Sequence, residues 1–294
     1  MQTIEFRGSS GLSIVADEHG PADGPVVLLL HGGGQNRLAW KGSGAALAER
    51  GYRVVALDAR GHGDSAWCPD AQYEMETMAH DLLAVTEQLG AGRSAVVGAS
   101  LGGITALEAH AVTEYRDLFS AVVLVDITPQ VELDGVRRIV AFMTAHPDGF
   151  ANLEDAAAAI GAYNPHRPPP SNAAGLSKVL RQGADDRWHW HWDPRFMTER
   201  HALMESDPET WAAQRQAMAD RLHDSAGAMK APLLLVRGLQ SDLVSDDAVA
   251  ALRAAAPRAQ YVDVRGAGHM VAGDDNDAFT AAVTDFLSRH VPLS

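Results

Sequence analysis

The sequence predicts a three-layer α/β fold, in which a mostly parallel β-sheet is packed between helices. Short runs of aliphatic residues recur along the chain, and they are apolar throughout instead of alternating with polar residues. Such runs are typical of strands that are buried on both faces of a parallel sheet. Helical patterns lie between the runs, and the repetition of strand, helix and strand indicates an α/β architecture.

The strands and helices of this core are expected in a regular order. The predicted core strands are Val26–Leu30, Arg53–Leu57, Ser94–Val97, Ala121–Val125, Pro232–Val236 and Gln260–Val264. The predicted core helices are Gly44–Arg50, Thr77–Leu89, Leu101–Val112, Asp246–Ala256 and Asp275–His290. The opening segments Thr3–Arg7 and Leu12–Ala16 are expected to form an antiparallel hairpin at one edge of the sheet.

This alternation stops after Asp126 and resumes near Lys230. The stretch between them has no convincing strand pattern, but it has helical patterns over Gly135–Thr144, Leu153–Ile160 and Glu209–Ala226. We therefore expect a helical insertion at 129–229, called the lid segment below, between two parts of one core at 1–128 and 230–294.

Composition and charge exclude several classes of partner. The formal net charge of -14 disfavours binding to nucleic acid and to anionic membrane surfaces. Cys68 is the only cysteine, so an intrachain disulfide is impossible. The N-terminus lacks the pattern of a signal peptide, and the strongest apolar run, Val26–Leu30, is too short to span a bilayer. A cytoplasmic location is expected; the sequence does not indicate an oligomeric state.

A serine lies where the third predicted core strand meets the following helix. The residues Gly98-Ala99-Ser100-Leu101-Gly102 match the pattern G-x-S-x-G, directly after Ala95-Val96-Val97. This context is the one that a nucleophile elbow requires. Flanking glycines allow a sharp turn that exposes the hydroxyl, and the helix N-terminus favours developing negative charge. Ser100 is therefore the candidate nucleophile.

A serine hydroxyl needs a base and an orienting carboxylate to become an effective nucleophile. His269 is the candidate base, because it lies in the glycine-rich loop Gly266–Met270 after the last predicted strand. Asp242 is the preferred acid, since it follows the strand that includes Leu233–Val236 and gives the order Ser, Asp, His. Asp126 remains the alternative acid, because it also ends a predicted strand at the carboxyl edge of the sheet.

The first core strand ends in a second glycine-rich motif. The residues His31-Gly32-Gly33-Gly34 match a loop that supplies one oxyanion-hole amide. We assign the two oxyanion donors to the backbone N–H groups of Gly33 and Leu101. No G-x-G-x-x-G or G-K-[ST] pattern follows, which argues against a dinucleotide or a P-loop nucleotide site.

Together with the turn Gly61-His62-Gly63-Asp64-Ser65, these motifs resemble the α/β-hydrolase superfamily. The resemblance covers Val26–Val125 and Leu233–His290. It is strongest to the lidded group of esterases, lactonases, non-haem perhydrolases and epoxide hydrolases. Epoxide hydrolases and haloalkane dehalogenases have an aspartate at the elbow, whereas this chain has Ser100, which argues for acyl transfer. The resemblance implies an α/β-hydrolase fold with a helical lid and no cofactor.

The lid segment includes an aromatic run in which Trp188, Trp190 and Trp192 alternate with His189 and His191. In an extended chain the tryptophans would share one face. They are expected either to wall the substrate site or to pack the lid segment onto the core. No metal site is expected at the two histidines, because no acidic or cysteine partner stands at ligand spacing.

The combined motifs predict a serine hydrolase that cleaves an ester or lactone of an apolar or aromatic small molecule through an acyl-enzyme. Two alternatives stay open. A perhydrolase or a C–C bond hydrolase would use the same triad on another substrate. A non-catalytic protein of this fold would hold a ligand under the lid segment without turnover.

Overall fold

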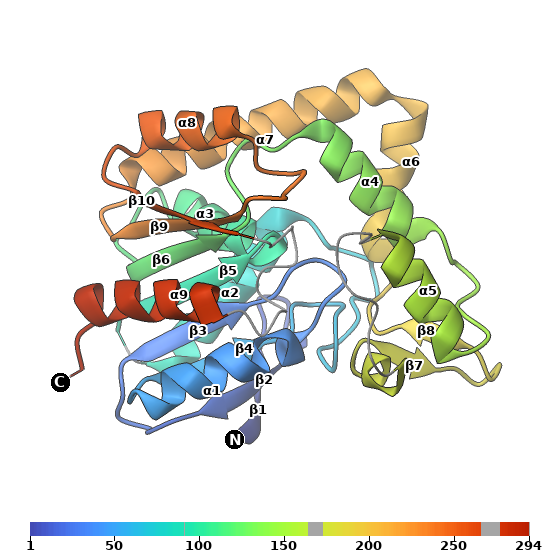
Figure 1. Cartoon of the computed structure of the whole chain (residues 1–294), viewed down its shortest axis with the longest axis horizontal. Helices are drawn as coiled ribbons and strands as arrows, with labels where there is room; N and C mark the ends of the chain where they lie inside the picture. Colours follow the sequence, from blue (N-terminus) through green and yellow to red (C-terminus); the bar gives the residue numbers. More distant parts are fainter. Residues whose placement is uncertain (91, 164–172, 266–276, 294) are drawn as a thin grey trace.

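The computed structural model describes residues 1–90, 92–163, 173–265 and 277–293. An eight-stranded sheet in the order β1-β2-β4-β3-β5-β6-β9-β10 forms its centre (Figure 1). Strands β1, β2 and β4 pair antiparallel to one another, and the remaining neighbours are parallel. The strands are β1 Gln2–Arg7, β2 Ser13–His19, β3 Val26–Leu30, β4 Arg53–Leu57, β5 Ser94–Ala99, β6 Phe119–Val125, β9 Leu233–Gly238 and β10 Gln260–Val264.

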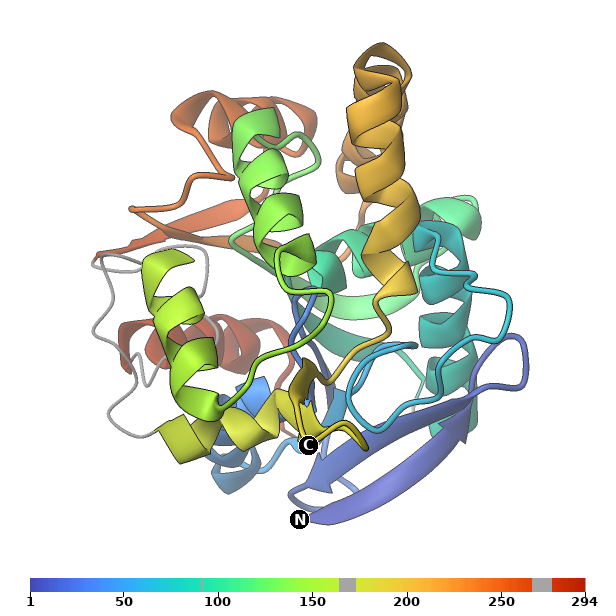
Figure 2. The same cartoon turned by 90° about the vertical axis from the view of Figure 1, so that its right-hand side faces the viewer.

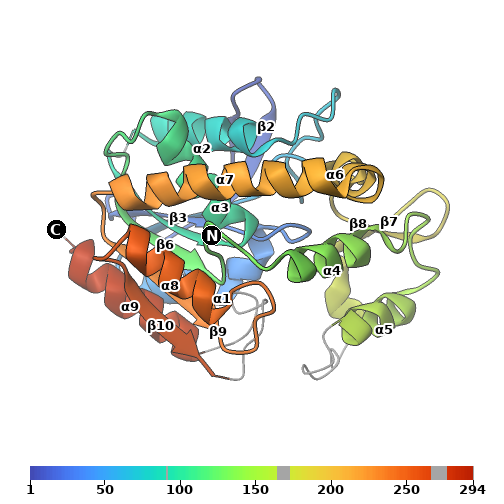
Figure 3. The same ribbon diagram turned by 90° about the horizontal axis from the view of Figure 1, so that it is seen from above.

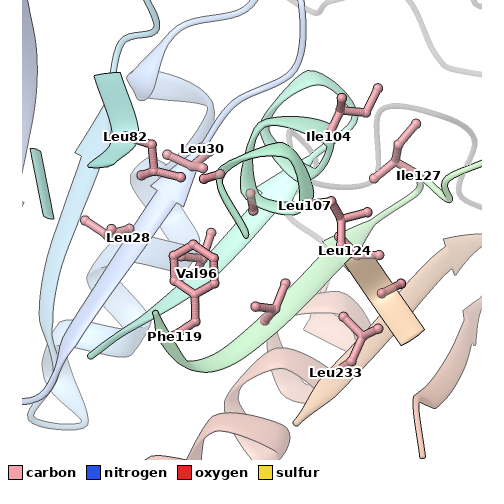
Figure 4. Close-up of a cluster of buried hydrophobic side chains, with 14 of the residues drawn as sticks. Leu28, Leu30, Leu82, Val96, Ile104, Leu107, Phe119, Leu124, Ile127 and Leu233 are labelled. Atoms are coloured by element: carbon pink, nitrogen blue, oxygen red, sulfur yellow. The ribbon is translucent and has the colours of Figure 1, made fainter. Parts of the chain in front are cut away.

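Alternate residues of the central strands face two separate apolar layers. Leu28 of β3 and Leu124 of β6 belong to one layer (Figure 4). This layer also includes buried side chains from four helices. These helices are α2 Met75–Leu89, α3 Leu101–Val112, α7 Pro208–Ala228 and α8 Asp246–Ala255. Leu29 and Val123 face the opposite layer, which is formed with α1 Lys41–Glu49 and α9 Asp277–His290. This burial on both faces explains why the strands are apolar throughout.

The chain between β6 and β9 leaves the sheet and forms the lid segment with its flanking turns. Figures 1 and 2 show α4 and α5 to one side of the sheet, and Figure 3 shows the long helix α7 leading from α6 back over the core. The elements are α4 Leu133–Thr144, α5 Leu153–Tyr163, the 3₁₀ helix η2 Ala173–Lys178, β7 Leu180–Gln182, β8 Trp188–Trp190, α6 Arg195–Ser206 and α7.

Most of the predicted core elements are confirmed. The strands Val26–Leu30, Arg53–Leu57 and Gln260–Val264 and the helix Leu101–Val112 have the predicted bounds. The expected N-terminal hairpin is present as β1 and β2.

The expectation that the lid segment has no strand was wrong. Strands β7 and β8 form a two-stranded antiparallel sheet. Each strand is three residues long, too short to give a recognisable pattern, and β8 also forms a bridge from Trp188 to Phe150. The helix α6 was not predicted; its N-cap residue is Pro194, and the side chain of Asp193 accepts the N–H of Arg195, the first helical residue, at 3.0 Å.

Within the described ranges, no helix combines the length and the apolar character needed to cross a bilayer.

Candidate active site

Ser100 lies at the turn between β5 and α3 in a backbone conformation that non-glycine residues rarely adopt, with φ 45° and ψ −109°. Its backbone N–H donates to the carbonyl oxygen of Val125 at 3.1 Å, which ties the turn to β6. A strained residue held in this way is typical of a functional position.

The glycines on either side are required by close backbone approach. A Cβ atom at Gly98 would lie 2.5 Å from the backbone nitrogen of Gly103, and one at Gly102 would lie 2.4 Å from the carbonyl oxygen of Leu30. Both separations are shorter than real contacts, so larger residues would force the strand and the helix apart. The G-x-S-x-G pattern therefore has a steric cause in this structure.

The glycine loop after β3 lies against the same turn. A Cβ atom on Gly32 would be 3.6 Å from the Cβ atom of Ser100. His31 fixes the start of this loop, because its Nδ1 lies 2.7 Å from the carbonyl oxygen of Gly32 and its Nε2 accepts the N–H of Ala59 at 2.9 Å. Burial lowers the pKa of His31, which keeps the ring neutral and suits this donor and acceptor pair.

The two proposed oxyanion donors open onto one cavity with the serine. Gly33, Ser100 and Leu101 all line it. Leu101 is the first residue of α3, so its N–H has no acceptor within the helix. A helix N-terminus also favours negative charge. Both residues thus line the cavity into which the proposed nucleophile opens.

The cavity has a volume of about 1100 Å³ and lies between the sheet edge and the lid segment. Its lining is mostly apolar and includes Val136, Val140, Phe142, Met143, Met197 and Trp211 from the lid segment. Six charged residues also reach the lining: Glu74, Glu76, Lys178, Arg200, Arg215 and Arg221. A mostly apolar cavity with a few polar groups is typical of a site for a small organic ligand.

Two of the three lid tryptophans line this cavity. Trp190 and Trp192 belong to its wall, whereas Trp188 does not. Of the two expectations, walling the substrate site is therefore corrected for Trp188. Trp188 forms a bridge to Phe150 and, like Trp190, packs against the small cluster that includes Phe150. Trp192 also packs against the core, because its ring stacks on His62 with centroids 6.4 Å apart.

The turn Gly61–Ser65 anchors the lid segment. The N–H of Gly63 donates to the carbonyl oxygen of His191 at 2.8 Å, and the N–H of Asp193 donates to that of Gly61 at 2.7 Å. Burial lowers the pKa of His62 to about 3, so this ring stays neutral beneath Trp192. The turn thus has a structural role in holding the aromatic wall in place.

Two carboxylates stand at the carboxyl edge of the sheet. Asp126 is 1% exposed, and it accepts the N–H of Gly238 at 2.9 Å and the hydroxyl of Ser241 at 2.6 Å. Asp242 follows in the same loop after β9; its side chain is 27% exposed and lies 2.8 Å from the guanidinium of Arg138 on α4. Asp126 thus holds the loop that includes Asp242.

The predicted base, His269, lies outside the described residues, as does its loop Gly266–Met270. The described histidines of the aromatic run have acidic neighbours: His189 lies 3.0 Å from Asp185, and His191 lies 3.7 Å from Asp64. In the described part of the chain, no group of three or more histidine, cysteine, aspartate or glutamate side chains is arranged to hold a metal ion.

Comparison with known proteins agrees with this geometry. Residues 25–275 match the model of a protein family that is described as "alpha/beta hydrolase fold". The chain belongs to the α/β-hydrolase family. Esterase Rv0045c of Mycobacterium tuberculosis is 32% identical over 270 residues, which are 90% of this chain and 83% of the esterase. The 3-hydroxybutyrate-oligomer hydrolase of Cupriavidus necator is 29% identical over 85% of this chain and 84% of that enzyme.

Solved structures give the same result for the fold. The crystal structure of E-2-(acetamidomethylene)succinate hydrolase matches with a TM-score of 0.80 and 25% identity, over 98% of this chain and 100% of that one. A crystal structure of the M. tuberculosis esterase matches with a TM-score of 0.72 and 28% identity, over 98% and 92% of the two chains. These relatives support an enzyme of the α/β-hydrolase class and hydrolysis of esters in general.

Sequence reasoning missed the charged residues of the cavity wall. The cavity-lining Arg215 lies in the middle of α7, among many polar residues of a largely exposed helix. No motif distinguishes it, and only its spacing between Trp211 and Met218, which also line the cavity, marks the inward face.

Proposed function

We propose that this α/β-hydrolase cleaves a carboxylic ester or lactone of an apolar or aromatic small molecule through an acyl-enzyme on Ser100. One observation supports this most directly. Ser100 is the residue at a strained strand-to-helix turn, and it opens into a lidded, mostly apolar cavity beside Gly33 and Leu101.

In the proposed reaction, His269 takes the proton of Ser100 as the hydroxyl attacks the carbonyl carbon. The N–H groups of Gly33 and Leu101 stabilise the oxyanion of the tetrahedral intermediate. His269 then protonates the leaving alcohol as the C–O bond breaks. Water, activated by His269, attacks the acyl-enzyme and releases the carboxylic acid, which restores Ser100.

We propose Asp242 as the acid that orients His269, with Asp126 as the alternative. The carboxylate of Asp242 is partly exposed, and its described contact is an ion pair with the exposed Arg138. The oxygens of Asp126 already accept two hydrogen bonds that fix the loop after β9. This arrangement favours a structural role for Asp126 and leaves Asp242 as the better orienting acid.

The experiment that tests the proposal is turnover of a short p-nitrophenyl ester by the wild type and by Ser100→Ala. Loss of the nucleophile should lower kcat by about 10⁴-fold or more, to the low rate that the oxyanion hole alone supports. A Ser100→Ala variant with turnover near that of the wild type would remove Ser100 from the mechanism.

Two other functions would use the same site. A perhydrolase or a C–C bond hydrolase would retain the triad, and product analysis distinguishes them from an esterase. A ligand-binding protein would react with a fluorophosphonate at Ser100 but show no turnover on a panel of esters, lactones and thioesters. The combination of elbow, glycine loop and cavity favours the enzyme, because a binder does not need an oxyanion hole.

A further inference from the structure

We propose that the cavity includes a subsite for a carboxylate, formed by Arg215, and that the substrate is a carboxylate-bearing ester with an apolar portion between its two ends. This inference rests on the proposed esterase function and specifies its substrate class.

Arg215 lies on the face of α7 that lines the cavity. Trp211, one turn earlier, and Met218, one turn later, line the same wall. The guanidinium of Arg215 is partly buried among these apolar neighbours, and burial lowers its pKa. A guanidinium nevertheless stays protonated at neutral pH, so a full positive charge lies in the apolar wall.

No carboxylate in the described part of the chain forms an ion pair with Arg215, although the covered arginines of the core have such partners. Arg60 pairs with Asp81 at 2.6 Å and Arg237 with Asp263 at 2.9 Å. Burial of a charge without a partner is costly. An arginine left in this state at a cavity wall is therefore ready to bind an anion.

The other cations of the cavity have partners or lie at its exposed rim. Arg200 donates to the carbonyl oxygens of Phe196 at 2.9 Å and Tyr73 at 2.7 Å. Arg221 lies 2.8 Å from the buried Glu108. Lys178 is exposed. Arg215 thus differs from the other cavity cations in two ways. It lies among apolar side chains, and its guanidinium has no carboxylate partner in the described part of the chain.

The shape of the ligand follows from the position of this charge. A planar guanidinium binds a carboxylate through two parallel hydrogen bonds, and low local polarity strengthens the interaction. The Met and Trp side chains of the lid segment suit an apolar stretch between the carboxylate and the ester carbon at Ser100. The carboxylate can belong to the acyl group or to the alcohol, and the two are distinguished by experiment.

The test compares esters that differ only in charge. One series uses mono-p-nitrophenyl esters of succinate, glutarate, adipate and suberate with their methyl-capped neutral forms. A second pair uses 4-carboxyphenyl hexanoate and its neutral methyl ester, which places the carboxylate on the alcohol. The wild type should have a higher kcat/KM for the charged member of at least one pair, and Arg215→Gln should lower that preference by about 10- to 100-fold.

Lys178→Gln is the matched control, because it removes another cavity cation that lies at the rim. It should change the preference far less than Arg215→Gln does. Equal losses in the two variants, or no preference in any pair of the wild type, would overturn the subsite. Arg215→Gln should also melt at a temperature no lower than the wild type, since it removes an unpaired charge; a clear fall in Tm would assign Arg215 a structural role instead.

Binding separates this proposal from the esterase proposal. Calorimetry with adipate, which has no ester bond, on Ser100→Ala should show saturable binding that is lost in Ser100→Ala/Arg215→Gln. Such binding, together with a wild type that turns over none of the esters, would support the subsite and reject the esterase. Ester turnover without adipate binding and without charge preference would reject the subsite and keep the esterase.

Discussion

At the scale of single residues, the site depends on backbone positions that the sheet holds in place. Ser100 and Asp126 both have positive φ angles, 45° and 48°, and both stand directly after parallel strands. Hydrogen bonds from the N–H of Ser100 to Val125 and from the N–H of Asp126 to Val236 stabilise these turns. The strain is thus compensated by the sheet that positions Ser100 and the loop of Asp242, the proposed nucleophile and acid.

The choice of acid gives a prediction at this scale. Asp242→Asn should lower kcat by about 10⁴-fold with little change in Tm, because the amide cannot stabilise the protonated form of His269. Asp126→Asn should mainly lower Tm, since an amide cannot accept the hydrogen bonds of both Gly238 and Ser241 as the carboxylate does. Steady-state kinetics and thermal melts of both variants provide the measurement.

Arg138→Gln is the control for Asp242. It removes the ion pair of Asp242 without touching the carboxylate, and a pair whose arginine is exposed to solvent contributes little to stability. Its kcat should stay near that of the wild type. If Asp126→Asn abolishes turnover while Asp242→Asn retains it, Asp126 is the orienting acid and the assignment here is wrong.

The sequence was informative about those residues whose chemistry needs a fixed spacing. Ser100 could be proposed as nucleophile because a strand, two glycines and a helix surround it, and Gly33 could be proposed as an oxyanion donor because its loop follows the first parallel strand. Arg215 could not be found, because a cavity residue on a long helix is marked only by three-dimensional packing. The choice between Asp242 and Asp126 stayed open, since both follow strands at the same edge of the sheet.

At the scale of elements, the contact between α3 and β3 positions Ser100, the proposed nucleophile. This contact can be tested at Gly102 of α3. Gly44 of α1 provides the matched control, because it is also a helical glycine. Gly102→Ala should destabilise the fold by about 1–3 kcal/mol, since its Cβ would lie 2.4 Å from the carbonyl oxygen of Leu30. Gly44→Ala should leave stability unchanged or raise it by up to about 1 kcal/mol, because its Cβ would lie an ordinary 3.5 Å from Leu29.

Urea denaturation of the two variants measures this difference. A Gly102→Ala variant as stable as Gly44→Ala would show that α3 has room for a methyl group against β3, and that close packing does not require a glycine at the elbow.

Helices and strands were predictable where the hydrophobic pattern of the sequence matches the burial of the side chains in the structure. The strands β3 and β4 have the predicted bounds, because their apolar runs end where the sheet ends. The edge strand β10 also has the predicted bounds, although it includes the polar residues Gln260 and Asp263. The hairpin of β7 and β8 was missed, since three-residue strands owe their existence to the partner and to Phe150 more than to their own composition. The helix α6 was missed because its sequence has only a weak amphipathic pattern, although Asp193 and Pro194 stand at its start.

At the scale of the whole molecule, the lid segment and the core enclose the cavity and are also joined by direct contacts, called the anchor here. The anchor is the turn Gly61–Ser65, whose backbone pairs with the chain around Trp192. Tyr73 of the core adds to it by donating to the buried Asp193 at 2.5 Å. The aromatic wall is therefore fixed relative to Ser100 by contacts on the core side. The existence of an insertion was predictable from the interrupted alternation, but the cavity shape depends on contacts between distant segments.

The central claim is that Ser100 forms a covalent bond with the substrate. Mass spectrometry of the protein quenched during turnover of a p-nitrophenyl ester tests it most directly. The tryptic peptide 94–116 contains Ser100, and fragmentation separates it from Ser94. The account predicts an added acyl mass on Ser100. An acyl group on another residue during productive turnover, or turnover by a Ser100→Ala variant at the wild-type rate, would contradict it.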